Sequence, residues 1–202
     1  MRILRNIILI ISLLLFIIFA SYLITQEFFK KNNSLSNIDK EELKKISLIN
    51  QKNISINAIE ILTEPSIIFF GFTNCPDICP LTLSKLSLSL QKIKKDQKIL
   101  LYFVSLDPER DTPETLNDYL QSFNDQVVGL TGTENNLKLF TQSLGIKYTK
   151  RKTSYGYTID HNSSSLLISN SKVVDKIFFK DDLDTSINKI NSFLRNLNQT
   201  SF

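Results

Sequence analysis

A continuous apolar run from Ser66 to Phe72 is followed, after two residues, by a pair of cysteines, Cys75 and Cys79. A run of this length and composition is typical of a β-strand that is covered on both faces, as in parallel sheets. Successive side chains of such a strand point to opposite faces, so helices must pack above and below it. The chain is therefore predicted to form a layered α/β domain with the cysteines at the end of one strand.

The segments after the cysteines alternate between short apolar runs and longer amphipathic ones, which predicts strands and helices in turn. Thr112 before Pro113 predicts the start of one helix, and Gly145 predicts the end of another. The predicted elements are a helix over 80–95, a strand over 99–106, a helix over 113–123, a strand over 127–130, a helix over 133–144, a hairpin of 166–168 and 173–179, and a helix over 183–197. This is the element order of the thioredoxin fold with one inserted strand and helix.

An uncharged stretch from Asn6 to Gln26, rich in Ile, Leu and Phe, precedes this domain. Its length matches the roughly 20 apolar residues that a helix needs to cross the hydrocarbon layer. A cleaved signal peptide is the alternative, but Phe19 to Ser21 is a poor match to its cleavage site. Residues 1–26 are therefore predicted to be a transmembrane anchor. Residues 27–45 are predicted to be a tether and residues 46–202 the folded domain.

The net charge of +4 does not indicate a nucleic-acid partner. Residues 1–31 hold four basic residues and one acidic residue, which leaves 20 basic and 19 acidic residues in the remainder. The remainder is nearly neutral and has no basic run interleaved with aromatic residues. We therefore expect no nucleic-acid binding.

Cys75 and Cys79 lie where a buried strand is followed by a helix. Free N–H groups and the macrodipole at a helix N-terminus stabilise a thiolate, so we expect these thiols to have lowered pKa values. Their spacing allows a disulfide, a metal site or a redox couple. A purely structural disulfide is the weakest of these, because closing so short a loop removes little entropy from the unfolded chain.

His161 is the only histidine in the chain. It precedes the predicted strand 166–168, which in a thioredoxin-type sheet starts beside the cysteine loop. Two thiolates and one imidazole suit Cu(I), and with a fourth weak ligand they suit Cu(II). Zinc would need a fourth protein ligand, for which Asp77 or Asp160 is available. We predict a metal site made of the two cysteines and His161, which favours copper as the ion and leaves zinc as the alternative.

Three separated motifs resemble the signatures of the Sco/SenC family. They are Gly71 to Pro80 (GFTNCPDICP), Val104 to Pro113 (VSLDPERDTP) and Tyr157 to His161 (YTIDH). The resemblance covers the chain from about Ser47 to its end. It implies a thioredoxin fold behind a single transmembrane anchor, with copper bound by the motif cysteines and histidine, here Cys75, Cys79 and His161.

The resemblance also implies a task and a location. The implied task is delivery of copper to the binuclear copper site of cytochrome c oxidase subunit II. The alternative is a thiol-disulfide reductase that keeps the cysteines of that site reduced. The domain would face the periplasm from a bacterial inner membrane, or the intermembrane space from a mitochondrial inner membrane, with residues 6–26 in the bilayer.

The segment from Asp107 to Pro113 has two interpretations. In the structural one, Thr112 caps a helix and Arg110 forms an ion pair. In the functional one, the loop borders the metal site and meets a partner protein. Tyr155 and Tyr157, close to the histidine, are predicted to serve packing rather than recognition.

Overall fold

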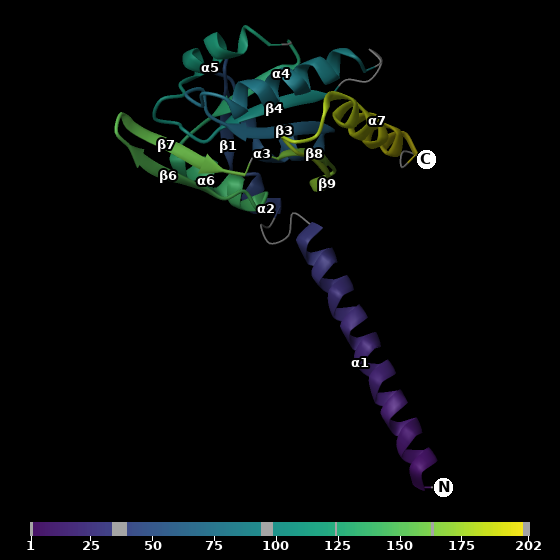
Figure 1. The fold of residues 1–202 in the computed structure, drawn as a ribbon. Helices are drawn as coiled ribbons and strands as arrows, with labels where there is room; N and C mark the ends of the chain where they lie inside the picture. Colours follow the sequence, from purple (N-terminus) through teal and green to yellow (C-terminus); the bar gives the residue numbers. More distant parts are fainter. Residues whose placement is uncertain (1, 34–39, 94–98, 124, 163, 200–202) are drawn as a thin grey trace.

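The structure is a computed structural model that describes residues 2–33, 40–93, 99–123, 125–162 and 164–199. Helix α1 (Arg2–Asn33) covers the predicted anchor and extends away from the folded domain (Figure 1). Within the described ranges, no helix has both the length and the apolar character that crossing a membrane requires. Parts of each predicted segment fall outside these ranges: residue 1 of the anchor, residues 34–39 of the tether, and residues 94–98, 124, 163 and 200–202 of the domain, of which 94 and 95 belong to a predicted helix.

The domain is built on a seven-stranded sheet in the order β2-β1-β5-β4-β3-β8-β9. β3 (Ser66–Gly71) pairs in parallel with β4 (Leu100–Ser105), which pairs in parallel with β5 (Val127–Thr131). β8 (Ser165–Ser169) and β9 (Lys172–Ile177) form the predicted antiparallel hairpin beside β3. The predicted strands and their directions are confirmed.

Four predicted helices are also present. They are α4 (Ile78–Gln91), α5 (Pro113–Leu120), α6 (Glu134–Ser143) and α7 (Leu183–Gln199). The α4 helix begins two residues before the predicted start, at Ile78, and therefore contains Pro80. A proline is tolerated there because N–H groups of a first helical turn have no intrahelical partner.

Local end signals act as predicted. The Thr112 hydroxyl accepts a hydrogen bond from the Thr115 N–H at 3.2 Å, and Pro113 is the first residue of α5. Gly145, just after α6, has a φ of +66°. Asn170 and Ser171, between β8 and β9, have φ of 50° and 59°, as a tight two-residue hairpin turn requires.

Five further elements were not predicted. They are β1 (Ser47–Asn50), β2 (Ser55–Asn57), α3 (Ala58–Thr63), β6 (Tyr148–Thr153) and β7 (Gly156–His161). A short helix, α2 (Lys40–Leu43), lies in the predicted tether. The β6 strand reads YTKRKT, without apolar alternation, because it is largely exposed. It pairs with β7 in a two-stranded ribbon that is separate from the main sheet.

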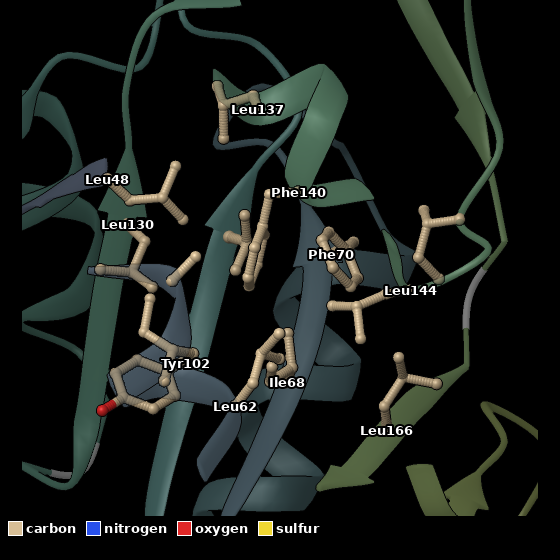
Figure 2. Close-up of a cluster of buried hydrophobic side chains, with 14 of the residues drawn as sticks. Leu48, Leu62, Ile68, Phe70, Tyr102, Leu130, Leu137, Phe140, Leu144 and Leu166 are labelled. Atoms are coloured by element: carbon tan, nitrogen blue, oxygen red, sulfur yellow. The ribbon is translucent and has the colours of Figure 1, made fainter. Parts of the chain in front are cut away.

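The side chains of β3 divide between two hydrophobic cores. Ile67 and Phe69 pack with residues of α4, α5 and α7 on one face. Ile68 and Phe70 pack on the other face with residues of α3 and α6, including Phe140 (Figure 2). Every residue of β3 is buried, so the strand is a firm base for the cysteine loop that follows it.

Candidate functional site

The two cysteines lie at the carboxyl end of β3, as predicted. Cys79 is in the first turn of α4 and is fully buried, whereas Cys75 precedes the helix and is half-buried. The Cys75 N–H donates to the Phe72 carbonyl at 3.2 Å, which closes a turn between strand and helix. Both cysteines are free thiols, so the pair is available for metal or redox chemistry.

Gly71, the last residue of β3, allows this close approach of α4 to the sheet. A Cβ at position 71 would lie 2.9 Å from Cys79 Sγ and 2.7 Å from Cε2 of Phe103. Both distances are shorter than a van der Waals contact between carbon and its neighbours. The sulfur of Cys79 therefore occupies space that any side chain at position 71 would fill.

The pKa of the Cys79 thiol lies well above its usual value, opposite to the predicted shift. Burial is the largest cause, because it penalises the charged thiolate. The neighbouring Cys75 thiol adds to the rise in the pKa of Cys79. The prediction of an acidic thiol is therefore wrong for Cys79, because desolvation outweighs the helix N-terminus.

His161, the last residue of β7, lies beside the cysteines. Its Nε2 is 4.0 Å from Cys79 Sγ, and its ring packs edge-on against Phe72 with 6.2 Å between ring centroids. Nδ1 lies 2.8 Å from the carbonyl oxygen of Asn162. A carbonyl only accepts, so Nδ1 carries the proton and the lone pair is on Nε2, facing the sulfur. Burial lowers the pKa of His161, which favours this neutral form.

A cavity of about 200 Å³ separates the cysteine loop from β7. Cys75 and His161 both line it, together with the ring of Phe72. Asp160, a possible fourth ligand, pairs with Arg151 at 2.8 Å, and this contact holds the pKa of Asp160 below its usual value. Across the part of the chain that the structure describes, no three His, Cys, Asp or Glu side chains are grouped closely enough to hold a metal ion as they stand.

The loop between β4 and α5 contacts both segments that carry the predicted ligands. The carboxylate of Asp111 accepts hydrogen bonds from the N–H and hydroxyl of Thr73, at 3.0 and 2.6 Å. Asp107 forms an ion pair with Arg110 and accepts a hydrogen bond from the Tyr157 hydroxyl at 2.7 Å. The predicted ion pair is thus present, and the loop contacts the segments that lead to the cysteines and the histidine, whereas its bordering of the metal site stays a prediction. Its role in meeting a partner stays a prediction.

The two tyrosines near His161 behave differently. Tyr157 packs beneath the guanidinium of Arg110, whose Cζ is 3.9 Å from the ring centroid. Tyr155, at the tip of the β6–β7 ribbon, is 100% exposed. The prediction of packing is therefore right for Tyr157 and wrong for Tyr155, because the ribbon extends past the surface that it packs on.

Tyr119 is a residue near the site that the sequence did not single out. Its ring packs against Phe103 and Phe123 in tilted geometry, and its buried hydroxyl has no hydrogen-bond partner among the described residues. Burial, and next the nearby thiols of Cys79 and Cys75, raise the pKa of Tyr119. A tyrosine in an amphipathic helix is usually a core residue, so no sequence signal could have placed it here.

Comparison with known proteins adds an independent observation. Residues 37–195 match the SCO1/SenC family over most of the chain. The chain belongs to the SCO1/SenC family. An SCO2-like protein of Rickettsia typhi is 37% identical over 168 residues, covering 79% of this chain and 81% of the relative.

Solved structures of the family confirm the predicted α/β, thioredoxin-like fold of this SCO1/SenC protein. Arabidopsis thaliana ScoI with copper bound has a TM-score of 0.69 and 30% identity, covering 75% of this chain and 96% of that one. Bradyrhizobium japonicum ScoI with copper bound has a TM-score of 0.67 and 31% identity, covering 74% of this chain and 97% of that one. The three sequence motifs of this SCO1/SenC protein meet around the cavity and the loop beside it.

Proposed function

We propose that this protein is a copper metallochaperone that binds the ion through Cys75, Cys79 and His161. We propose that it delivers the ion to the binuclear copper site of cytochrome c oxidase subunit II. The observation that carries the proposal is the 4.0 Å separation of Cys79 Sγ and His161 Nε2, from segments 82 residues apart in sequence. Relatives solved with copper bound support the same ion.

The separation suits one metal ion held by both atoms. Metal–sulfur and metal–nitrogen bonds in proteins, taking zinc as a guide, are about 2.3 Å and about 2.0 Å. Their sum exceeds the observed 4.0 Å, so an ion can bind both atoms at once with a bent angle at the metal. The lone pair on Nε2 already faces the sulfur, and the neutral imidazole needs no proton removed.

Cys75 would complete the set by turning its thiol into the cavity that it shares with His161. Two thiolates and an imidazole are soft and borderline donors, which favour copper over Mg²⁺ or Ca²⁺. Both thiols must lose their protons to bind, so copper loading releases protons. Because burial holds the proton on Cys79, the metal itself must displace it.

Transfer by ligand exchange follows from the different exposure of the ligands. Cys75 is half-buried and lines the cavity, whereas Cys79 is fully covered. An incoming thiolate of the partner would therefore replace Cys75 first and Cys79 last. The ion stays bound to at least two donors throughout, so it is never released to water.

The test is Cu(I) binding by the purified, reduced full-length chain, measured in competition with a chromophoric chelator. Wild type should bind one equivalent. His161→Ala should weaken binding by about 100-fold. Loss of a residue that only supports a ligand already lowers metal affinity by about 10- to 100-fold, and loss of the ligand itself should cost at least the larger of these factors. Asn162→Ala is the matched control, because it keeps the backbone carbonyl that orients the ring. Equal affinity of His161→Ala and wild type would remove the histidine from the site.

A thiol-disulfide reductase is the second candidate, and it is favoured by two free thiols of which Cys75 is partly exposed and Cys79 is buried. Cys75 would attack a substrate disulfide, and Cys79 would then resolve the mixed disulfide, leaving the Cys75–Cys79 disulfide and a reduced substrate. The raised pKa of Cys79 slows the second step. Turnover that survives both His161→Ala and a copper chelator would favour this candidate over delivery.

We also propose that residues 6–26 anchor the protein, with the domain in the periplasm or the intermembrane space. The described apolar side chains of α1 are exposed, which favours contact with lipid over water. Removal of residues 1–26 should move the protein from the membrane fraction to the soluble fraction. A C-terminal alkaline phosphatase fusion should be active, since that enzyme needs an oxidising compartment, and an inactive fusion would place the domain in the cytoplasm.

A further inference from the structure

The loop from Asp107 to Thr112 holds two carboxylates, Asp107 and Asp111, that are both 0% exposed. A buried carboxylate destabilises a fold unless it is paired or well hydrogen-bonded. Both are satisfied here, but by different parts of the chain. Asp111 bonds the segment that leads to the cysteines, and Asp107 bonds the strand that ends in the histidine.

On the cysteine side, Asp111 holds Thr73, two residues before Cys75. Its carboxylate accepts the Thr73 N–H and hydroxyl, and it also accepts the Ser105 hydroxyl at 2.5 Å. Ser105 is the last residue of β4. The start of the cysteine loop is therefore tied to the neighbouring strand as well as to β3.

On the histidine side, Tyr157 is the residue that the loop holds. Its hydroxyl donates to Asp107 at 2.7 Å, with a further contact to Glu109 at 3.2 Å. Nη1 of Arg110 donates to the Tyr157 carbonyl at 3.3 Å, and the guanidinium lies over the ring. Three polar residues of the loop, Asp107, Glu109 and Arg110, thus converge on one residue of β7.

Tyr157 and His161 are geometrically coupled through β7. Residues 157, 159 and 161 of a strand point to the same face, and Ile159 is buried in the main core. Among the described residues, the β6–β7 ribbon has no backbone ladder with the seven-stranded sheet. Contacts that involve side chains must therefore help to set its position. The polar ones include those of Tyr157 with the loop and the ion pair of Lys150 with Glu109 at 2.7 Å.

We propose that Tyr157, held by Asp107 and Arg110, is a positioning residue that places the imidazole of His161 against Cys79. The test of this inference by copper affinity rests on the proposed copper function. The test by the position of the His161 ring in the metal-free protein does not. Without the Tyr157 hydroxyl, the ribbon loses a polar attachment and Asp107 loses a donor. His161 then spends less time within reach of the sulfur.

The first test is Tyr157→Phe, which removes one oxygen and keeps the ring beneath Arg110. Cu(I) affinity of the full-length chain should fall about tenfold, as for loss of an outer-shell partner. Tyr155→Phe on the same ribbon is the matched control, because its side chain is fully exposed, and it should leave affinity unchanged. In a His161→Ala background, Tyr157→Phe should produce no further loss, because the two changes act through one contact.

The second test uses the metal-free protein, so it is independent of copper. The ring protons of His161 should shift in the NMR spectrum of Tyr157→Phe, because the ring moves relative to Phe72, and should not shift in Tyr155→Phe. If Tyr157→Phe does not fold, Arg110→Lys is the second variant. It keeps the positive charge beside Asp107 but removes the guanidinium that lies over the Tyr157 ring, and it should produce the same shift of the His161 ring protons. If the wild-type protein binds no Cu(I), the proposed function is wrong. The shift of the His161 ring protons then still tests whether Tyr157 positions the imidazole.

Two results would overturn the positioning role. One is wild-type affinity together with unshifted His161 resonances in Tyr157→Phe. The other is an equal loss of affinity when Tyr157→Phe is added to His161→Ala, which would mean general loosening of the domain.

Discussion

Gly71→Ala tests the close packing of Cys79 against β3. The new Cβ would lie 2.7 Å from Phe103 and 2.9 Å from Cys79 Sγ, so both buried neighbours must move away from it. Overpacking of this kind destabilises a protein by about 1–3 kcal/mol. The backbone of Gly71 is not in the left-handed region, so alanine also stabilises by about 0.4–1 kcal/mol through the unfolded chain. The free energy of unfolding should therefore fall by about 1.3 kcal/mol at the midpoints of these two ranges, and by at most about 2.6 kcal/mol.

The change should also affect the metal site, because the sulfur has to move. The assay is urea unfolding of the reduced protein followed by circular dichroism, since the chain has no Trp, with Cu(I) affinity measured in parallel. Gly132→Ala is the control. Its Cβ would meet the end of the Leu48 side chain at 3.3 Å and backbone atoms of Leu48 and Ser47 at 3.7 Å, an ordinary contact distance, so stability should change little and copper affinity not at all. Wild-type stability and affinity in Gly71→Ala would refute the close approach of Cys79 to the strand.

Two further predictions concern His161 and the β8–β9 turn. Burial lowers the pKa of His161 below its usual 6.5, so between the lowered value and 6.5 the unfolded chain binds more protons and stability must rise with pH. His161→Gln should abolish this slope in unfolding measurements on the metal-free protein, and an unchanged slope would assign it to another group. Ser171→Gly should raise the free energy of unfolding by about 0.5 kcal/mol, because Ser171 has a φ of 59° and glycine adopts this conformation without strain. Thermal unfolding would measure the gain, and Ser171→Ala should show none.

Local signals in the sequence were enough to predict most of the sheet and its helices. The apolar run of β3, the Thr112 cap and the turn before β9 each depend on neighbours within a few residues. Such features form wherever the local pattern is satisfied, so they can be read along the chain. The β6–β7 ribbon could not be predicted in this way, because its strands carry polar residues whose pairing depends on the surface that they lie against.

The sequence by itself determined which donors the protein has: two cysteines at the start of a helix and a single histidine. Only the tertiary structure decided that Cys79 and His161 meet, that Asp107 reaches Tyr157 across 50 residues, and that burial raises the pKa of Cys79. The physical reason is that distance and desolvation are properties of packing. A residue type states which chemistry is possible, and the packed chain determines how close its atoms come and how much water they keep.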